Sequence, residues 1–547
     1  MVQLSRRQVL LAAGAAATVS LAGCGDGGDE KKDQNLSGNR SGAMDKDGVG
    51  DQFTATAPLS FSILYNNHPN YPLRNDWLFW SELTKRTQVT LQPVAVPLSD
   101  YEQKRSVLIG AGDAPLIIPK TYHPSENAFV SSGAILPVSD YLDLMPNFKD
   151  KISKWKLQPE IDTLRQEDGK FYLLPGLHEK PWHDYSLAVR TDILEQLNLT
   201  APRTWDDVYT MLKAMKAAHP DTYPFSERFN KPNPGGNLLN ILAASYGLAG
   251  AGWNFQHVSW DDKAKKFVYT YASVQYRQLL EYLHKLVAEG LFDPEGFTQT
   301  DDAARQKLAS GKSFVISANA QSVVNDYRPD LAKTIPNAKI AKIPLPIGLA
   351  GPINPASRLE NGVMISKKAR DSKNFVAMMQ FVDWLYYSDA GQEFAKWGVE
   401  STTYTKDASG KRTLAPDVNV LGLNPAGTKH LQKDFGFYNG VFAYGGRLEL
   451  VQSFFSAEEM EFQKEMNSRK NIPVAPPFPF TDSEREQATL WETPLKDYVT
   501  QMTLKFVLGQ RPLSEWDAYV TELKGKNMTQ YMDLVAKAYD RYKKNHG

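Results

Sequence analysis

Short apolar strands alternate with amphipathic helices after position 58, and this order restricts the fold more than any other feature of the chain. In "LSFSILYNN", Leu59, Phe61, Ile63 and Tyr65 alternate with smaller residues, which is typical of a strand. "DWLFWSELTKRTQ" and "DYEQKRSVLIGAGDAP" have the pattern of helices, and "VTLQPVAVP" and "LIIP" that of strands. Strand–helix–strand order with helices of this length predicts βαβ units and a largely parallel sheet.

The length of the chain predicts more than one domain. It has 547 residues, and the part that follows its polar N-terminal stretch is too long for a single hydrophobic core. In "TWDDVYTMLKAMK" a helix begins with Thr204 as its N-cap and Asp207 three residues later, the arrangement of a capping box. From about Phe480 onwards we predict an almost entirely helical C-terminus.

The single cysteine of the chain follows a short apolar run. The run from Val9 to Gly23 has 15 residues, whereas a membrane-spanning helix needs about 20. Arg6 and Arg7 precede it, as in twin-arginine export signals, and it ends in "LAGC", which resembles a bacterial lipobox. We predict a signal peptide over residues 1–23 and a lipid on Cys24, since no second cysteine exists for an intrachain disulfide. An ordinary cleaved signal with an incidental cysteine is the alternative.

Residues 24–54 are rich in Gly, Asp, Ser, Asn and Lys and have almost nothing to bury, so we predict a disordered tether. No later apolar run reaches about 18 residues. The body is therefore expected to be extracytoplasmic and anchored to the cell membrane by the lipid. Lys plus Arg and Asp plus Glu number 62 each, and without a basic excess no nucleic-acid partner is expected.

Several stretches, in the same order along the chain, share their patterns with one known family. They include "DGKFYLLP", "AVRTDILEQLNLTAPRTWDDVYTMLKAMK" and "LASGKSFVISAN". These stretches resemble the extracellular solute-binding proteins (family 1) that deliver sugars to bacterial ABC importers. "WGVESTTYTKDASGK" and the tail "LKFVLGQRPLSEWDAYVTELKGKNMTQYMDLVAKAYDRY" are similar to a subgroup of large lipoproteins in that family, and the matches span roughly Leu59 to Tyr542.

The resemblance implies a two-lobe α/β fold of the periplasmic-binding-protein kind (type II), with a ligand cleft between the lobes and a helical C-terminus. It implies hinge crossings, which we place near residues 181–186 and 349–362, with a further return after Glu400. The expected lobes are residues 55–183 and 360–400 for lobe 1, and residues 184–359 and 401–547 for lobe 2. The implied function is that of a monomer without a cofactor, which captures a carbohydrate, an oligosaccharide in our interpretation, for the permease subunits of an ABC transporter.

A sugar site needs aromatic platforms for the ring faces and polar side chains for the hydroxyl groups. In open α/β sheets such sites lie beyond the carboxyl ends of strands. The candidate ligand-binding residues are Tyr65, Asn67, His68, Arg74, Trp77, Trp182, His183, Asp184, Arg190, Trp253, Asn254, Asn319, Gln321, Tyr438, Asn439, Tyr444 and Arg447. For each aromatic residue the alternative is a place in the core, and for Arg190 it is an ion pair with Asp192.

The chain lacks the patterns of a metal site. Some large relatives that bind uronate polymers carry a calcium loop of the form D-x-[DN]-x-[DN]-G. The matching stretch "AAHPDTYPFSERFN" has Asp221 as its only carboxylate before Glu227, and it has no glycine. Nine scattered histidines and one cysteine form no zinc pattern. We therefore predict no metal.

Different functions stay open at this level. A secreted glycosidase needs only two carboxylates flanking the scissile bond, and among 62 acidic residues such a pair can always be imagined. No P-loop, nucleophile elbow or zincin motif occurs, so we predict a protein that is not an enzyme. A second hypothesis keeps the fold but gives it a peptide, polyol or phosphate-ester ligand, and a third is a purely structural lipoprotein.

Overall fold

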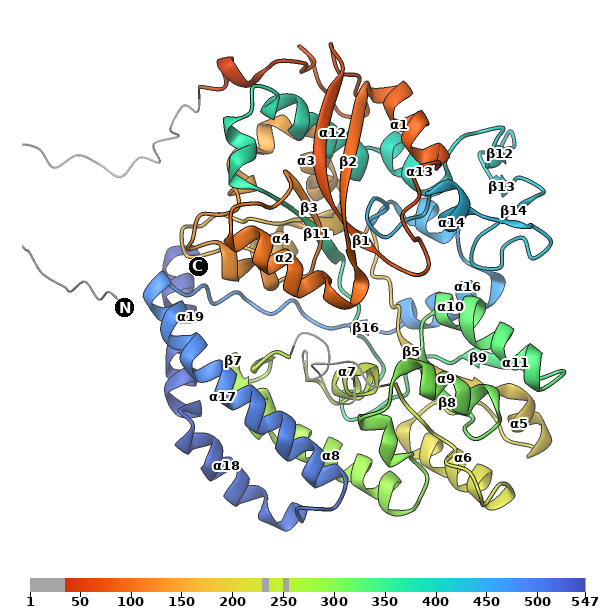
Figure 1. The fold of residues 1–547 in the computed structure, drawn as a ribbon. Helices are drawn as coiled ribbons and strands as arrows, with labels where there is room; N and C mark the ends of the chain where they lie inside the picture. The colour runs from red at the N-terminus through yellow and green to blue at the C-terminus, as the bar shows by residue number, and fades with distance from the viewer. Residues whose placement is uncertain (1–34, 229–235, 249–254, 547) are drawn as a thin grey trace, which may run out of the picture.

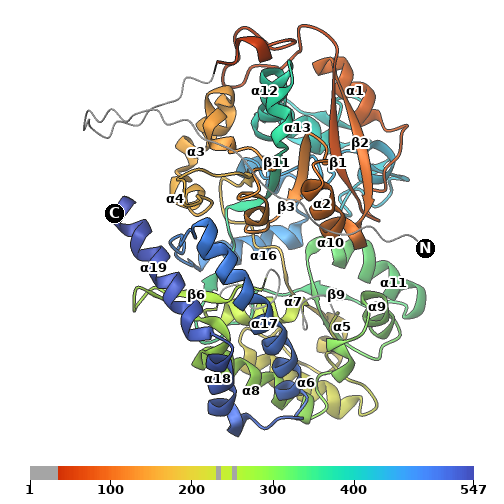
Figure 2. The same ribbon diagram turned by 60° about the vertical axis from the view of Figure 1, so that its left-hand side comes forward.

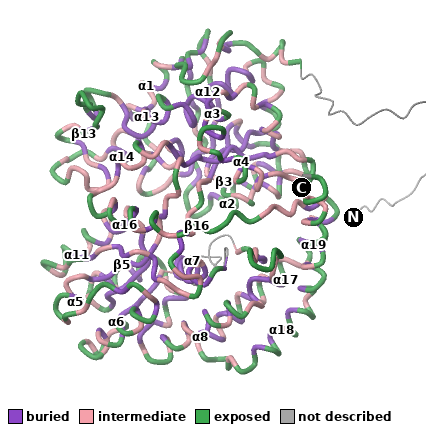
Figure 3. Tube along the Cα trace, turned by 180° about the vertical axis from the view of Figure 1, so that it is seen from behind, coloured by how far each residue is buried: buried purple, intermediate pink, exposed green. Residues whose placement is uncertain are grey.

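The computed structural model describes residues 35–228, 236–248 and 255–546. The chain forms two lobes, drawn as the upper and lower halves of Figure 1. Buried residues are concentrated within each lobe (Figure 3), and the larger clusters of buried side chains belong to lobe 1 and lobe 2 respectively. The predicted two-lobe α/β fold is thereby confirmed.

Lobe 1 is built on a five-stranded sheet in the order β2-β1-β3-β11-β4. The first three strands are parallel and alternate with helices along the chain, as the sequence predicted. The strand β11 lies antiparallel between β3 and β4, although it follows lobe 2 in the sequence. The bounds are β1 Leu59–Asn67, α1 Leu78–Thr87, β2 Val89–Pro97, α2 Tyr101–Gly110, β3 Ile117–Thr121, β4 Leu174–Leu177 and β11 Leu359–Ile365.

A fully buried helix, α12 (Phe375–Tyr387), packs in lobe 1 beside α3 (Pro146–Trp155) and α13 (Asp389–Trp397). Its Asp383 carboxylate accepts hydrogen bonds from the backbone N–H of Asn147 (2.9 Å) and of Phe148 (2.9 Å), and from the Asn147 amide (2.8 Å). These two residues lie in the first turn of α3, where backbone donors have no partner within the helix. The carboxylate therefore fastens α3 to α12.

Lobe 2 has a three-stranded antiparallel sheet in the order β8-β5-β9, unlike the parallel sheet that the sequence pattern suggested. The predicted capping box is present, with Asp207 N–H donating to Thr204 Oγ1 (3.0 Å) and Thr204 N–H to Asp207 Oδ2 (2.9 Å). The bounds are β5 Ser186–Arg190, β8 Val315–Ala318, β9 Ile340–Lys342, α6 Trp205–Ala218, α7 Gly236–Ser245 and α8 Val274–Ala288.

The C-terminus is helical, as predicted, in α17 (Asp482–Val507), α18 (Trp516–Gly525) and α19 (Met528–His546). These helices cover one flank of lobe 2, and the end of α19 reaches up to lobe 1 near α4 (Figures 1 and 2).

The remaining α-helices are α4 Gln158–Asp162, α5 Thr191–Gln196, α9 Asp301–Ala309, α10 Ala320–Ser322, α11 Arg328–Thr334, α14 Leu431–Phe435, α15 Leu448–Gln452 and α16 Ala457–Ser468, with a π-helical turn at Val323–Tyr327. The remaining strands are β6 Val258–Asp261, β7 Lys266–Tyr269, β10 Ile353–Asn354, β12 Tyr404–Lys406, β13 Arg412–Leu414, β14 Val418–Asn419, β15 Lys429–His430 and β16 Lys470–Asn471.

The chain passes between the lobes more than once, as expected. The first passage joins β4 in lobe 1 to β5 in lobe 2, at residues 178–185. The second joins β9 to β11, at residues 343–358. Both overlap the predicted crossings at residues 181–186 and 349–362.

The third passage lies later than predicted. Phe454 is buried in the core of lobe 1, and Phe462 in the core of lobe 2. The segment after Glu400 therefore stays with lobe 1 instead of returning to lobe 2. Its apolar side chains complete the lobe 1 core, where the ring of Phe442 stacks on Phe79 of α1 with centroids 4.5 Å apart.

The tether prediction needs correction for its second half. Residues 35–54 pack on lobe 1, and Phe53 is fully buried with its ring edge-on to Phe381 of α12. The Asn39 amide donates to the Ser372 carbonyl (2.8 Å), and Gln380 accepts from the Met44 backbone N–H (3.0 Å). A few apolar side chains in a polar stretch suffice to order it once a groove receives them. Cys24 lies outside the described residues, and no helix within the described ranges has the length and apolar character needed to cross a bilayer.

Replacing Asp383 by alanine is expected to lower the free energy of unfolding by about 3 kcal/mol, because three buried donors at the start of α3 lose their acceptor. Urea unfolding followed by tryptophan fluorescence measures the change. The control is Asp143→Ala, which removes an exposed carboxylate 2.7 Å from the Lys149 ammonium and should change stability by less than about 0.5 kcal/mol. Equal effects of the two substitutions would contradict the anchoring role.

Candidate functional site

One edge of each sheet faces the other lobe. In lobe 1 this edge holds the carboxyl ends of β1, β3 and β4 and the start of the antiparallel β11. In lobe 2 it holds the start of β5 and the ends of β8 and β9. We call the residues on and beside these edges the interlobe face: Asn67, His68, Lys120, Tyr122, His178, Glu360 and Tyr438 from lobe 1, and Asp184, Tyr185, Glu227, Arg228, Asn319, Gln321, Lys342 and Glu459 from lobe 2.

Electrostatic interactions between groups on the two edges show that the edges lie near each other. The phenol of Tyr122 in lobe 1 interacts with that of Tyr185 in lobe 2, whose pKa is raised to about 12, chiefly by burial. Glu360 in lobe 1 similarly acts on Asp184 in lobe 2, and burial is again the main reason why the pKa of Asp184 rises to about 6. Tyr438 interacts with Asp184 as well. Aromatic, acidic and basic groups of both lobes thus meet in one region.

Lys120, on the lobe 1 side, is held by hydrogen bonds to both its backbone N–H and its carbonyl. Its backbone has a φ of 56°, the left-handed region that residues with a side chain rarely adopt. Its N–H donates to Tyr444 Oη (2.9 Å), and its carbonyl accepts from the buried guanidinium of Arg105 (2.8 Å). These bonds hold the strained residue at the end of β3.

Glu360 and His178 form a hydrogen-bonded pair at the same edge. The Glu360 carboxylate lies 3.1 Å from His178 Nε2 and accepts from the Gly445 N–H (2.9 Å). Burial disfavours its charged form, but these bonds and the neighbouring Lys396 lower its pKa to about 2. Glu360 is therefore an anion with its hydrogen bonds already made.

The lobe 2 side also has a buried carboxyl group with partners of its own. Glu227 accepts from the Ser317 N–H (2.9 Å), the Ser317 hydroxyl (2.6 Å) and the Arg228 N–H (2.9 Å). Its burial raises its pKa to about 7. Lys342 donates to Glu459 (3.0 Å) and to the Asp184 carbonyl (3.1 Å), which ties α16 to the start of β5.

The first passage between the lobes contributes Trp182 and His183. Trp182 is partly exposed, its ring lies 5.6 Å from that of His178, and among the described residues its indole N–H finds no acceptor. The backbone N–H and carbonyl of His183 bind both ends of the Gln463 amide (3.3 and 2.6 Å). An aromatic ring with a spare donor thus stands at the hinge.

The structure brings about half of the predicted binding residues to this region. Asn319 caps α10 just after β8 and donates to the Asp184 carboxylate (3.3 Å). His68 stacks on Tyr71, and burial together with Lys120 lowers its pKa to about 4. The predicted residues found at the interlobe face or hinge are Asn67, His68, Trp182, His183, Asp184, Asn319, Gln321 and Tyr438.

Four other predicted residues belong to the lobe 1 core. Tyr65 is fully buried, donates to the Tyr71 carbonyl (2.6 Å) and accepts from Asn439 (2.9 Å). Trp77 is also buried and donates to the Lys433 carbonyl (2.8 Å). Tyr444, the fourth, holds the Lys120 backbone instead of facing the other lobe. These four residues therefore belong to the core, which was the alternative for each aromatic residue. The C-terminal part of lobe 1 packs over the end of β1 and over the segment that follows it.

Three predicted arginines form ion pairs away from the interlobe face. Arg74 pairs with Asp76 (2.8 Å), and Arg447 with Asp389 (2.9 Å). Arg190 makes two hydrogen bonds to Asp192 (2.8 and 2.6 Å) at the far end of β5, so its ion-pair alternative holds. Trp253 and Asn254 lie outside the described residues.

Several residues of the interlobe face escaped the sequence analysis. Lys120 and Tyr122 directly follow the predicted strand "LIIP", and the rule for strand ends could have found them. Tyr185 lies in the "KPWHDY" loop, which was singled out for its neighbours. Glu360 and Arg228 carry no local signal, because only the folding of the two lobes brings them to these edges.

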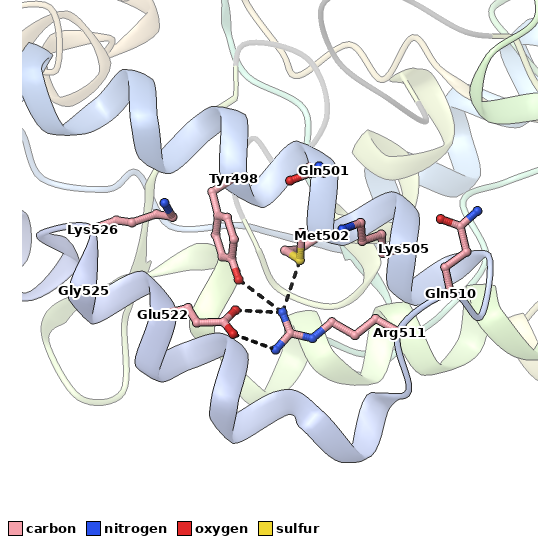
Figure 4. Close-up of a pocket in the computed structure, with 9 residues that line it drawn as sticks. All are labelled: Tyr498, Gln501, Met502, Lys505, Gln510, Arg511, Glu522, Gly525 and Lys526. Atoms are coloured by element: carbon pink, nitrogen blue, oxygen red, sulfur yellow. Dashed lines mark hydrogen bonds and ion pairs between the residues drawn. The ribbon is translucent and has the colours of Figure 1, made fainter.

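A hollow of about 660 Å³ lies between α17 and α18 on the outer flank of lobe 2 (Figure 4). Its central Arg511 donates to Glu522 (2.8 Å) and to Tyr498 Oη (3.2 Å), so the main charges are already paired. It is remote from both sheet edges. The interlobe face is therefore the stronger candidate site.

Residues 219–224, at the position examined for a calcium loop, do not suit a cation. The Lys216 ammonium, itself a positive charge, donates to the Thr222 carbonyl (2.8 Å). Asp221 supplies the one carboxylate of the loop at residues 219–224, whereas calcium takes six to eight oxygen ligands. Within the described part of the chain no group of three or more His, Cys, Asp or Glu residues could hold a metal ion.

Comparisons with known proteins agree with this architecture. Residues 77–393 match the family model described as "Bacterial extracellular solute-binding protein". The chain is 23% identical over 523 residues to the fructooligosaccharide ABC transporter substrate-binding protein FusA of Streptococcus pneumoniae, covering 90% of both chains. It is 22% identical to the polygalacturonan/rhamnogalacturonan-binding protein YtcQ of Bacillus subtilis, over 84% of this chain and 88% of that one. Among solved structures, the alginate-binding protein AlgQ2 without calcium ion superposes with a TM-score of 0.67 at 20% identity, covering 89% of this chain and 99% of that one.

We expect a chelator such as EDTA to leave the melting temperature unchanged, because Lys216 takes the place of a cation at the Thr222 carbonyl. Lys216→Met should lower the stability by about 1 kcal/mol. Lys213→Met on the same helix, whose exposed ammonium is 3.9 Å from Glu289, serves as the control and should have little effect. Differential scanning calorimetry gives all three values, and a chelator-induced drop would show that the protein does bind a structural metal.

Proposed function

Because the chain belongs to the bacterial extracellular solute-binding proteins, we propose that it captures an oligosaccharide between its lobes and delivers it to the permease of an ABC transporter. The interlobe face carries this proposal: the edges of two sheets meet there with tyrosines, amides and charged groups, the combination that sugar rings and hydroxyls require. The names of FusA, YtcQ and AlgQ2, each for an oligo- or polysaccharide, support a carbohydrate ligand. In this role the ligand leaves chemically unchanged, so the protein is not an enzyme.

The proposed binding residues come from both lobes and the hinge. Tyr122, Tyr185 and Tyr438 offer rings, and Trp182 at the hinge offers a ring whose N–H donor has no acceptor among the described residues. The proposed hydrogen-bonding residues are Asn67, His68, Asp184, Asn319 and Gln321. A ligand that touches both lobes binds the closed arrangement better than an open one, so binding drives closure.

The lobes touch each other outside the binding region at Gly422 and Val324. Gly422 belongs to the lobe 1 loop after β14 and has a φ of 71°. A Cβ atom at this position would lie 2.9 Å from Val324 Cγ1 in the π-helical turn of lobe 2. The absence of a side chain at residue 422 therefore lets the two lobes come together.

Calorimetric titration with a panel of oligosaccharides tests the proposal. At least one should bind, raise the melting temperature and reduce the radius of gyration in small-angle scattering. Gly422→Leu should weaken binding about tenfold or more, because the added side chain opposes closure.

Gly410→Leu is the matched control: Gly410 also has a left-handed φ of 83°, but its added Cβ would meet nothing within 4 Å. It should carry the same backbone strain and bind as the parent does. If no oligosaccharide binds, or if binding leaves the scattering profile unchanged, capture by closure is wrong.

We further propose that the protein is exported by the twin-arginine route, lipidated on Cys24 and held as a monomer at the outer surface of the cell membrane. The support is the "LAGC" sequence at the end of the apolar run. A tethered binding protein stays close to the permease that it serves.

Cys24→Ser is expected to move the protein from the membrane fraction to the soluble fraction, or to leave it as an uncleaved precursor, because the thiol is the lipid attachment atom. Fractionation of cells and mass spectrometry of the processed N-terminus measure this. A Ser20→Ala variant of the same apolar run serves as control and should fractionate like the parent. Unaltered fractionation and processing of Cys24→Ser would exclude lipidation.

A further inference from the structure

Two cations on the interlobe face lack close carboxylate partners. Within the described residues Lys120 Nζ makes no ion pair within 4.0 Å. Arg228, with 14% of its side chain exposed, forms a long ion pair with Asp301, at 3.8 Å. Partly or fully desolvated charges ordinarily have a counter-charge. Among the described residues neither charged group is hydrogen-bonded to a carboxylate, and this points to a ligand.

Each cation is paired with a tyrosine. The Lys120 ammonium hydrogen-bonds to Tyr122 and lies 5.7 Å from the centre of its ring. The Arg228 guanidinium hydrogen-bonds to Tyr185 and lies 5.9 Å from its ring centre. The two tyrosines interact electrostatically across the lobes. A cation and an aromatic ring from lobe 1 thus face the same combination from lobe 2.

The nearby carboxylates are committed elsewhere. Glu360 acts on Lys120 through space, but its hydrogen bonds go to His178 and Gly445. Glu227 lies beside Arg228, but its oxygens accept from Ser317 and from the Arg228 backbone, not from the guanidinium. Neither carboxylate neutralises its neighbouring cation by direct contact.

The backbone strain at Lys120 supports a binding role. A left-handed φ at a residue with a side chain persists only where surrounding bonds enforce it, and such residues concentrate at functional sites. Here Tyr444 and Arg105 enforce it from both sides of the residue. Neither bond involves the ammonium, so the arrangement orients a side chain whose charge is left for another molecule.

We propose that the captured oligosaccharide is anionic, and that its charged group lies between Lys120 and Arg228 with sugar rings against Tyr122 and Tyr185. This inference rests on the proposed function and names its substrate class. A uronate carboxylate and a sulfate ester share the required chemistry, since both accept several hydrogen bonds from cations. Contact with one cation from each lobe would also couple ligand binding to closure.

The test is calorimetric titration of the full chain with three trisaccharides: trigalacturonate, a sulfated trisaccharide and a neutral fructan trisaccharide. We expect one or both anionic probes to bind at least about tenfold more tightly than the neutral one, with an affinity that falls as salt rises. The two anionic probes distinguish carboxylate from sulfate recognition. This comparison uses the unaltered protein, so it does not depend on how a variant folds.

Variants then test whether Lys120 and Arg228 bind the charged group of the ligand. Lys120→Met and Arg228→Met should each weaken anionic binding about tenfold or more and remove part of its salt dependence. Lys85→Met, which removes an exposed lysine of lobe 1, should bind as the parent does. Melting curves confirm that each variant is folded.

The outcomes separate the two proposals. Preference for the neutral trisaccharide, or unchanged anionic affinity in folded Lys120→Met and Arg228→Met variants, would overturn the anionic class and leave oligosaccharide capture standing. Failure of every oligosaccharide, neutral or charged, would overturn the proposed function itself.

Discussion

The insertion of β11 into the sheet of lobe 1 is the constraint on which the rest of the structure depends. This strand pairs with β3 on one side and with β4 on the other, so lobe 1 is complete only after the chain has built most of lobe 2 and returned. Gly362 makes the insertion possible, because a Cβ at that position would lie 2.2 Å from the Leu174 carbonyl. The insertion also places Glu360 beside His178, and the two passages that flank lobe 2 become the hinge.

Charge distribution on the interlobe face follows from the cost of burying ions. Acidic groups there are satisfied by donors of their own lobe: Glu227 by Ser317, and Glu360 by His178 and Gly445. A carboxyl group whose hydrogen bonds are made within one lobe rigidifies that lobe and does not bind the other lobe. Lys120 and Arg228 hydrogen-bond to tyrosines and not to carboxylates, and they lie on opposite lobes. A ligand that contacts both residues binds the closed state more tightly than the open state. This difference in affinity is the condition for a binding protein to close on its ligand.

Predictions that rested on local patterns succeeded where the neighbours along the chain decide the outcome. The βαβ order predicted β1, β2 and β3, and the Thr204 capping box formed because its partners are three residues apart. The rule for strand ends placed Asn67, His68 and Asn319 at the interlobe face. The prediction of aromatic binding residues was less accurate. Tyr65 and Trp77 are residue types that could stack on a sugar ring, but residues more than 350 positions later in the chain cover them. An alternating pattern shows which side chains of a strand share a face of the sheet, but it does not show which segment of the chain packs on that face.

The sequence by itself determined the class of fold and the helical C-terminus, because periodicity and capping are local properties. The order of its motifs indicated the family, and the resemblance to that family implied the two lobes and the first two passages between them. Tertiary structure alone decided that residues 401–454 complete lobe 1, that residues 35–54 pack on it and that Arg190 pairs with Asp192. It also decided which charged groups meet between the lobes. Those outcomes depend on burial and on contacts between residues far apart in the chain, and the free energy of a buried charge is set by neighbours that only the folded chain supplies.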